Sequence, residues 1–154
     1  MAGIRPADRS DLPGGAPGDT LYSIEEPRLL PEEGPVLDQL RAELLRRLGD
    51  EETGPPDPGR LHAMVGRIAA GRSDLADPAR RARLEYYLSR DLLGYGPIDV
   101  LLRDPEIEEV TVDGVGAPAY VVHRERGVLA TTLRFETEPE LDRFVRSLAE
   151  RAGA

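Results

Sequence analysis

The apolar residues in the first half of the chain recur every three or four positions, which is the period of an amphipathic helix. Three such stripes follow one another: Val36, Leu37, Leu40, Leu44, Leu45 and Leu48; then Leu61, Met64, Val65 and Ile68; then Leu84, Tyr87, Leu88 and Leu92. Asp57-Pro58 and Asp77-Pro78 each place a capping carboxylate before a proline, so they predict where the second and third helices begin. Because each stripe needs a neighbour to cover it, residues 28–93 are expected to form a helical bundle, with a linker at 49–59.

After residue 94 the apolar period changes. Pro97 is expected to start a short helix that Asp104-Pro105 closes, and three strands are expected at 107–112, 119–123 and 128–135. Thr137 and Glu140 have the spacing of a capping box, which opens a final helix. Its apolar face consists of Leu141, Phe144, Val145 and Leu148.

The predicted fold class is α+β: a helical bundle followed by a small three-stranded antiparallel sheet with a packed helix. Residues 1–27 are rich in Gly, Pro, Asp and Arg and are expected to be a flexible leader, with Tyr22 and Ile24 available to attach its end to the body. Residues 94–154 are expected to form an α/β subdomain that is incomplete, because its strand edges have no visible protection. The residues expected to be buried there are Val110, Val112, Val121, Leu133, Phe144 and Leu148.

Composition restricts the possible partners. The formal net charge of −9 disfavours broad attraction to nucleic acid or anionic lipid. All 20 basic residues are arginines and asparagine is absent, which fits a GC-rich genome; the acidic surplus also suits a halophilic archaeon. Cysteine is absent, which excludes disulfides and thiolate metal sites. No apolar run approaches the ~20 residues of a membrane span, and the first residues are too polar for a signal peptide, so we expect a cytoplasmic protein without direct membrane insertion.

The candidate chemical motifs each have a simpler interpretation. Without lysine, no P-loop is present, and Gly94-Tyr95-Gly96 is better explained as a helix cap and turn than as a dinucleotide fingerprint. His62 and His123 lack ligand-spaced partners. A solvated strand face explains the acidic residues Glu106, Glu108, Glu109 and Asp113. Intrahelical pairing with Asp77, Glu85 and neighbouring acids, or an interface with an acidic partner, explains the basic residues Arg80, Arg81, Arg83 and Arg90. No catalytic, cofactor-binding or metal-ligating residue is predicted.

Three segments, in this order and spacing, carry a family resemblance: YYLSRDLLGYGPIDVLLRDPEIEEVTVDG (86–114), AYVVHRERG (119–127) and LDRFVRSLAERAG (141–153). Together they resemble the amino-terminal region of the type II/IV secretion-type ATPases. The archaeal pilus, archaellum and secretion motors are most similar, because there a leader like YSIEEPRLL precedes the bundle and a His-Arg pair ends the second strand. Thr131-Thr132 departs from that branch, where Thr-Asn is more usual.

The resemblance implies a hexameric motor in which a RecA-like core binds ATP and Mg²⁺ and passes its motion to a membrane platform protein. That core and the family's nucleotide-contacting arginines are expected to lie outside this chain. The chain is therefore expected to be the non-catalytic amino-terminal region, with no cofactor of its own, and to contact the platform protein and neighbouring ATPase subunits. It would then be peripheral to the cytoplasmic membrane through partners. The alternative is a stand-alone interaction or regulatory module derived from such an ATPase; an independent enzyme is disfavoured because no nucleophile–base pair is present.

Overall fold

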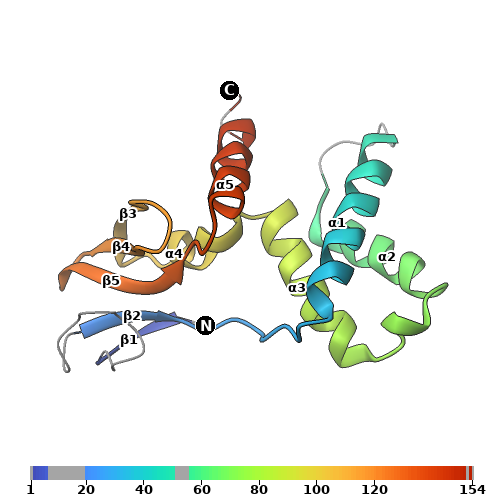
Figure 1. Ribbon diagram of the computed structural model, residues 1–154, viewed down its shortest axis with the longest axis horizontal. Coiled ribbons are helices and arrows are strands. Elements are labelled where there is room, and N and C mark those ends of the chain that lie inside the picture. The colour runs from blue at the N-terminus through green and yellow to red at the C-terminus, as the bar shows by residue number, and fades with distance from the viewer. Residues whose placement is uncertain (1, 7–19, 51–55, 152, 154) are drawn as a thin grey trace. The chain divides into compact units, whose positions relative to one another are not determined.

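A computed structural model describes residues 2–6, 20–50, 56–151 and 153 of the chain. The structure divides into two compact units (Figure 1). The helical unit comprises residues 27–96. The sheet unit comprises residues 1–26 together with residues 97–154, so the chain leaves it once and returns to it.

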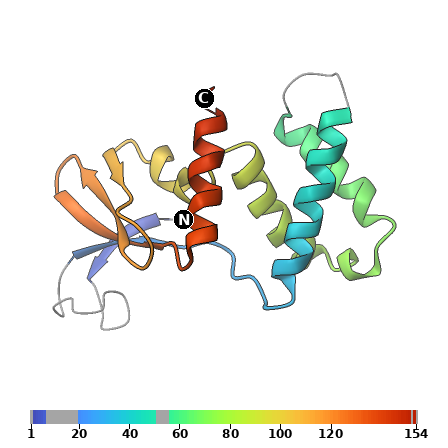
Figure 2. The ribbon, with the colours of Figure 1, turned by 45° about the horizontal axis from the view of Figure 1, so that its top comes forward.

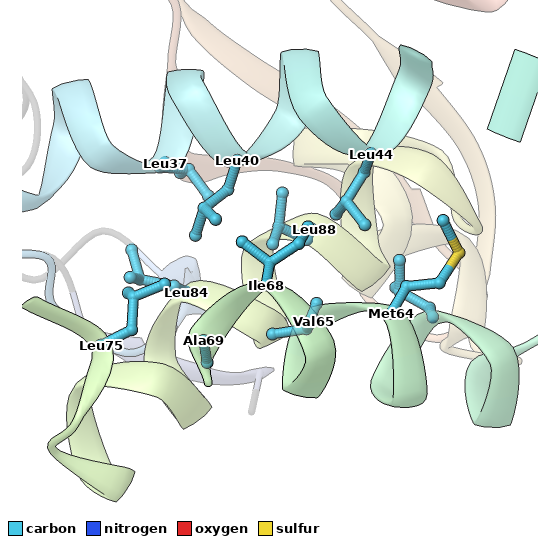
Figure 3. Packing of buried hydrophobic residues seen from close by; sticks show 11 residues of the cluster. Leu37, Leu40, Leu44, Met64, Val65, Ile68, Ala69, Leu75, Leu84 and Leu88 are labelled. Carbon is cyan, nitrogen blue, oxygen red and sulfur yellow. The ribbon is translucent and has the colours of Figure 1, made fainter. Parts of the chain in front are cut away.

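The helical unit consists of α1 (Glu33–Asp50), α2 (Pro58–Ala69), a single 3₁₀ turn (Ser73–Leu75) and α3 (Pro78–Leu92). The two predicted caps are confirmed: the Asp57 carboxylate accepts a hydrogen bond from the Arg60 amide at 2.8 Å, and the Asp77 carboxylate accepts one from the Ala79 amide at 3.1 Å. Residues of all three stripes meet in one core, in which side chains from all three helices point toward one another (Figure 3). Leu45, which was predicted to belong to the first stripe, is instead 53% exposed. That core contains Leu37, Leu40, Leu44, Leu61, Met64, Val65, Ile68, Ala69, Leu75, Leu84 and Leu88.

The sheet unit is larger than the sequence predicted. Its strands are β1 (Ala2–Pro6), β2 (Thr20–Ile24), β3 (Ile107–Thr111), β4 (Pro118–His123) and β5 (Gly127–Arg134), in the spatial order β1-β2-β5-β4-β3. The predicted meander of β3, β4 and β5 is present and antiparallel. However, β2 pairs in parallel with β5, and β1 pairs antiparallel with β2. The sheet is therefore mixed and five-stranded, rather than three-stranded and antiparallel.

The two additional strands come from the segment that was expected to be a flexible leader. Within its described residues, 2–6 and 20–24 lie in the sheet; residues 7–19 are outside the described part of the chain. The pairing is nonlocal, since Leu21 lies opposite Ala130 and Tyr22 opposite Thr131. A five-residue strand whose partner is more than a hundred positions away leaves almost no periodic signal in its own sequence, which is why composition suggested disorder.

The sheet unit also contains a short 3₁₀ turn (Gly96–Ile98) that continues into α4 (Asp99–Arg103), and a final helix, α5 (Glu138–Arg151). A second core lies between these helices and the sheet. Its buried residues are Tyr22, Ile98, Leu101, Val121, Leu129, Phe135 and Phe144, and the rings of Phe135 and Phe144 stack with centroids 4.8 Å apart. Among the residues predicted to be buried, Val121 and Phe144 are, while Val110, Val112, Leu133 and Leu148 are only half-buried against this core.

The capping box before α5 is confirmed with one change. The Glu140 amide donates to Thr137 Oγ1 at 3.3 Å, as predicted. The Glu140 carboxylate, however, accepts from the Glu136 amide at 2.9 Å rather than from the amide of the cap residue itself.

In both ribbon views, the C-terminal half of α5 projects away from the strands (Figures 1 and 2).

Candidate functional site

A buried tyrosine of β2 meets a carboxylate at the end of α4, near the histidine that ends β4. Tyr22 is almost fully buried, and its hydroxyl donates to Asp104 Oδ2 at 2.6 Å. Asp104 is the residue that ends α4, and its other oxygen accepts from the Glu106 amide at 2.9 Å. One carboxylate therefore connects a residue of β2 to the turn that leads into β3.

This hydrogen bond holds both partners in fixed protonation states. Burial raises the pKa of the Tyr22 phenol far above its ordinary value, and the hydrogen bond to Asp104 and that group's negative charge raise it further. The Tyr22 hydroxyl lowers the pKa of Asp104, and the Glu106 amide lowers it further. A general acid and base need pKa values near the working pH, whereas here the two values move apart from neutrality. The pair suits anchoring of β2 rather than proton transfer.

His123 is also buried, as the last residue of β4. Its Nδ1 atom accepts hydrogen bonds from the amides of Glu125 and Arg126, at 3.2 and 3.3 Å. Acceptance of two N–H groups assigns the proton of the neutral ring to Nε2. His123 thus caps the turn between β4 and β5, which is completed by Gly127 at φ +71°, a backbone conformation that favours glycine. The predicted absence of a ligand role for His123 remains a prediction.

The two threonines at the centre of β5 divide between the two neighbouring strands. Thr131 is buried, and its Oγ1 donates to the Ala119 carbonyl at 2.8 Å and accepts from the Leu133 amide at 3.1 Å. Thr132 Oγ1 accepts from the Ile24 amide at 2.9 Å, at the point where β2 ends. Thr132 therefore satisfies the last amide of β2.

In the helical unit, Arg80 and Arg83 of α3 pair with the start of α1 rather than within their own helix. Glu33 is fully buried at the start of α1; Arg83 lies 3.1 Å and Arg80 3.7 Å from its carboxylate oxygens. Burial by itself raises the pKa of Glu33, but the hydrogen bond from the Leu30 amide and the charges of Arg83 and Arg80 outweigh it, so the pKa is lowered. For Arg80 and Arg83 the expected intrahelical pairing is wrong, because the buried carboxylate of α1 lies within their reach. For Arg90 it is confirmed, since Arg90 pairs with its neighbour Asp91 on the same helix.

A second polar cluster connects the other end of α3 to α1. Asp91 accepts from Arg41 at 2.6 Å and from Arg90 at 2.8 Å. The Arg90 guanidinium also lies 4.8 Å from the centre of the Tyr87 ring, whose hydroxyl donates to the Pro27 carbonyl. The basic residues of α3 are thus largely occupied by interactions that fix the helices to one another.

The remaining candidate residues lie apart. His62 is exposed on α2 and its Nδ1 lies 2.5 Å from Glu85 Oε1. Glu108 and Glu109 are exposed on β3, and Glu108 lies 3.8 Å from Arg124. Gly94 donates its amide to the Ser89 carbonyl at 3.2 Å and Gly96 adopts φ +62°, as expected of a helix end and turn. In the described ranges, no group of three or more His, Asp or Glu residues is placed to hold a metal ion.

Sequence reasoning identified Asp104 only as a helix-closing residue and Tyr22 only as a point of attachment. Asp-Pro indicated the chain break at 104–105, but nothing local indicated the partner of its carboxylate, which lies 82 positions away. Likewise, Glu33 gave no sign that it would be buried, because it sits among the acidic and proline residues that precede the first apolar stripe.

None of the helices in the described part of the chain is long and apolar enough to cross a membrane.

Comparison with known proteins gives two partial relatives. The uncharacterized protein MJ1288 of Methanocaldococcus jannaschii is 47% identical over 77 residues, which is 50% of this chain and 31% of the relative. The uncharacterized protein MJ0900 of the same organism is 38% identical over 76 residues, which is 49% of this chain and 14% of the relative. No protein-family model matches the chain. The similarity thus covers half of this chain and less than a third of either curated relative.

Proposed function

We propose that the chain is the amino-terminal, non-catalytic region of a type II/IV secretion-type ATPase, in a motor that energises pilus or archaellum assembly or protein secretion. The observation that carries the proposal is the segment 86–114. It combines a helix that ends on a glycine pair, a proline-started short helix, an Asp-Pro break and a strand. The end of α3, α4 and β3 occupy those positions in that order, which supports the resemblance at the level of elements.

The matched relatives bear only on the archaeal side of the proposal, because both are uncharacterized. Both come from an archaeon, the group whose motors the sequence resembles most, and in both the similar region is a minor part of a longer protein. A region of this kind has a mechanical role in the proposed motor rather than a chemical one. Because the chain contains no lysine, it supplies no P-loop; ATP and Mg²⁺ would be bound by a RecA-like core.

The polar anchors described above suit such a role. Tyr22–Asp104 and Thr132–Ile24 attach β2 to the rest of its sheet, and Glu33–Arg83 attaches the start of α1 to α3. Transmission of motion requires rigid parts, and hydrogen bonds that connect distant segments favour rigidity within each unit. The proposed partners are neighbouring ATPase subunits and a membrane platform protein, which would place the chain peripherally at the cytoplasmic membrane.

A binding experiment tests the proposal. The purified chain would be immobilised and titrated with a detergent-solubilised platform protein from the same genome, with an unrelated membrane protein in the same detergent as control. Saturable binding to the platform protein, absent with the control, is expected. Equal signals from both membrane proteins would contradict the proposed partner.

The reading frame beyond codon 154 separates the proposal from its alternative. Continuation of the frame into a lysine-bearing glycine loop would support a region of a full ATPase. A stop codon followed by unrelated sequence would favour a stand-alone interaction or regulatory module derived from such an ATPase.

A further inference from the structure

The loop between β3 and β4 contains an aspartate and a glycine whose reactive groups are unrestrained. Asp113 is exposed and directly precedes Gly114. Among the described residues, neither the Asp113 carboxylate nor the Gly114 amide has a hydrogen-bond or ion-pair partner. A Cβ atom added to Gly114 would meet nothing within 4 Å, so the space around this residue is open. Both groups are therefore free to change their geometry.

The loop is held on both sides of this dipeptide. Before it, Val112 packs half-buried against the core of the sheet unit. After it, the Gly116 amide donates to the Phe135 carbonyl at 2.9 Å, and Arg134 Nη1 donates to the Gly116 carbonyl at 3.3 Å. The freedom is thus local to residues 113–114, and a rearrangement there does not require the neighbouring strands to unfold.

An aspartate that precedes a glycine has a chemistry of its own. The backbone nitrogen of the next residue can attack the side-chain carboxyl carbon and close a five-membered succinimide ring. Glycine has no Cβ to hinder this approach, and it adopts backbone conformations that other residues resist; Gly114 has a φ of +140°. In the whole sequence, Asp113 is the only aspartate that glycine follows.

The other aspartates of the described ranges are poorly placed for this ring closure. Three of them, Asp57, Asp77 and Asp104, precede proline, whose nitrogen carries no hydrogen to lose. The rest lie in helical segments, where the backbone nitrogen of the next residue is fixed by the helix geometry. These are Asp38, Asp50, Asp74, Asp91, Asp99 and Asp142.

We propose that Asp113 and Gly114 form a site of spontaneous isoaspartate formation, and that the product loosens the edge strand β3. The Gly114 nitrogen forms a bond to Asp113 Cγ, and its proton leaves with the carboxyl hydroxyl as one water molecule. Water then adds to one of the two ring carbonyls. Cleavage of the bond between nitrogen and Cγ restores aspartate, whereas cleavage of the bond between nitrogen and the main-chain carbonyl carbon gives isoaspartate. The net reaction is an isomerisation.

The product changes the connection of β3 to its partner strand. In isoaspartate the main chain runs through Cβ and Cγ, so the path from residue 113 to Gly114 is longer by one atom. In the described sheet β3 pairs with β4 alone, and this loop joins the two. A longer connection should therefore weaken the pairing near Thr111. The new residue also belongs to the substrate class of isoaspartyl carboxyl methyltransferases, which use S-adenosylmethionine. This inference does not depend on the proposed function.

Ageing of the full chain in mildly acidic buffer at physiological temperature tests the proposal. Digestion with trypsin gives the peptide 104–124, and electron-transfer dissociation should locate isoaspartate at Asp113 and not at Asp104. An isoaspartyl methyltransferase with labelled S-adenosylmethionine counts the modified residues. The folded chain should react at no less than about a tenth of the rate of the synthetic peptide 104–124, because a loop without partners for its polar groups opens at little cost.

Two variants separate this site from general ageing. Asp113→Glu should lower the accumulation by about tenfold or more, because glutamate must close a less favourable six-membered ring. Asp142→Glu is the matched control, since Asp142 is also exposed but lies in α5, and it should leave the accumulation unchanged.

Amide exchange of aged and fresh protein tests the structural consequence. In the isomerised chain the amides of β3 should exchange faster, whereas those of β5 should not change. Aged Asp113→Glu should exchange like fresh protein. An unmodified Asp113 in the folded chain under conditions in which the peptide reacts, accumulation in Asp113→Glu at the wild-type level, or unchanged exchange of β3 in the isomerised chain would overturn the proposal.

Discussion

Replacing Tyr22 by Phe should measure how much the hydrogen bond between β2 and Asp104 contributes to the stability of the sheet unit. The substitution removes one oxygen and keeps the ring that fills the core. The lost hydrogen bond is 2.6 Å long and has a charged acceptor, and such bonds contribute about 1.5–3 kcal/mol. Asp104 keeps the Glu106 amide as a donor, so its carboxylate is not left without a partner; we therefore expect a loss near the lower end, about 1.5–2 kcal/mol.

The effect of the substitution should depend on pH in a defined way. The pKa of Asp104 is lowered in the folded protein, so its contribution is present above the unfolded value of about 3.9 and is lost as the pH falls through the folded one. The pKa of Tyr22 is raised, so its contribution is present below the unfolded value of about 10 and is lost as the pH rises beyond it. The difference between wild type and Tyr22→Phe should therefore be constant between about pH 5 and 9 and shrink outside that window.

Urea titrations followed by amide spectra would report on each unit separately. The matched control is Tyr120→Phe, because Tyr120 is half-buried on β4 and in the described residues its hydroxyl forms no hydrogen bond. Tyr22→Phe should destabilise the sheet unit and leave the helical unit unchanged, and Tyr120→Phe should change either by less than about 0.5 kcal/mol. A loss equal to that of the control, or one that persists unchanged at pH 3, would refute the charged hydrogen bond as the cause.

Three further predictions concern the other anchors and the absent nucleotide site. Glu33→Gln should destabilise the helical unit by about 1–3 kcal/mol in urea titrations at pH 7, because Arg83 and Arg80 lose a buried counter-charge. The control Glu32→Gln should cost less than about 0.5 kcal/mol, since Glu32 is exposed. Because the pKa of Glu33 is lowered on folding, this difference should begin to shrink once the pH falls below the unfolded value of about 4.3, and should disappear as the pH falls through the lower folded value. Thr132→Val should speed amide exchange of Ile24 and cost about 1–2 kcal/mol, and Thr132→Ser, which keeps the acceptor, should not. Calorimetric titration with Mg-ATP should show no saturable binding, since the chain has no lysine with which to form a P-loop; micromolar affinity would contradict this.

The local parts of this fold were predictable because their signals lie within a few residues. The caps at Asp57 and Asp77 and the Thr137 box follow from side chains that reach amides two or three positions away. The helix stripes follow from burial on one face, which a periodic pattern records directly. In such segments the residue and its structural cause are neighbours in the sequence.

The parts that the sequence did not predict are those whose cause lies far away in the chain. β2 pairs with Ala130 and Thr131 and donates a hydrogen bond to Thr132, and its Tyr22 binds Asp104. Glu33 is buried with Arg83 as its partner, which lies fifty positions later in the sequence. Each of these contacts joins a segment with little periodicity of its own to an element that the pattern did reveal. The content of Gly, Pro and Asp made the predicted leader resemble a disordered tail. Two hydrogen bonds, one to a side chain of β5 and one to a side chain of the α4–β3 turn, nevertheless determine where its described end lies. Since both acceptors belong to the sheet unit, loss of either should weaken the pairing of β2 with β5 more than the pairing within the meander of β3, β4 and β5.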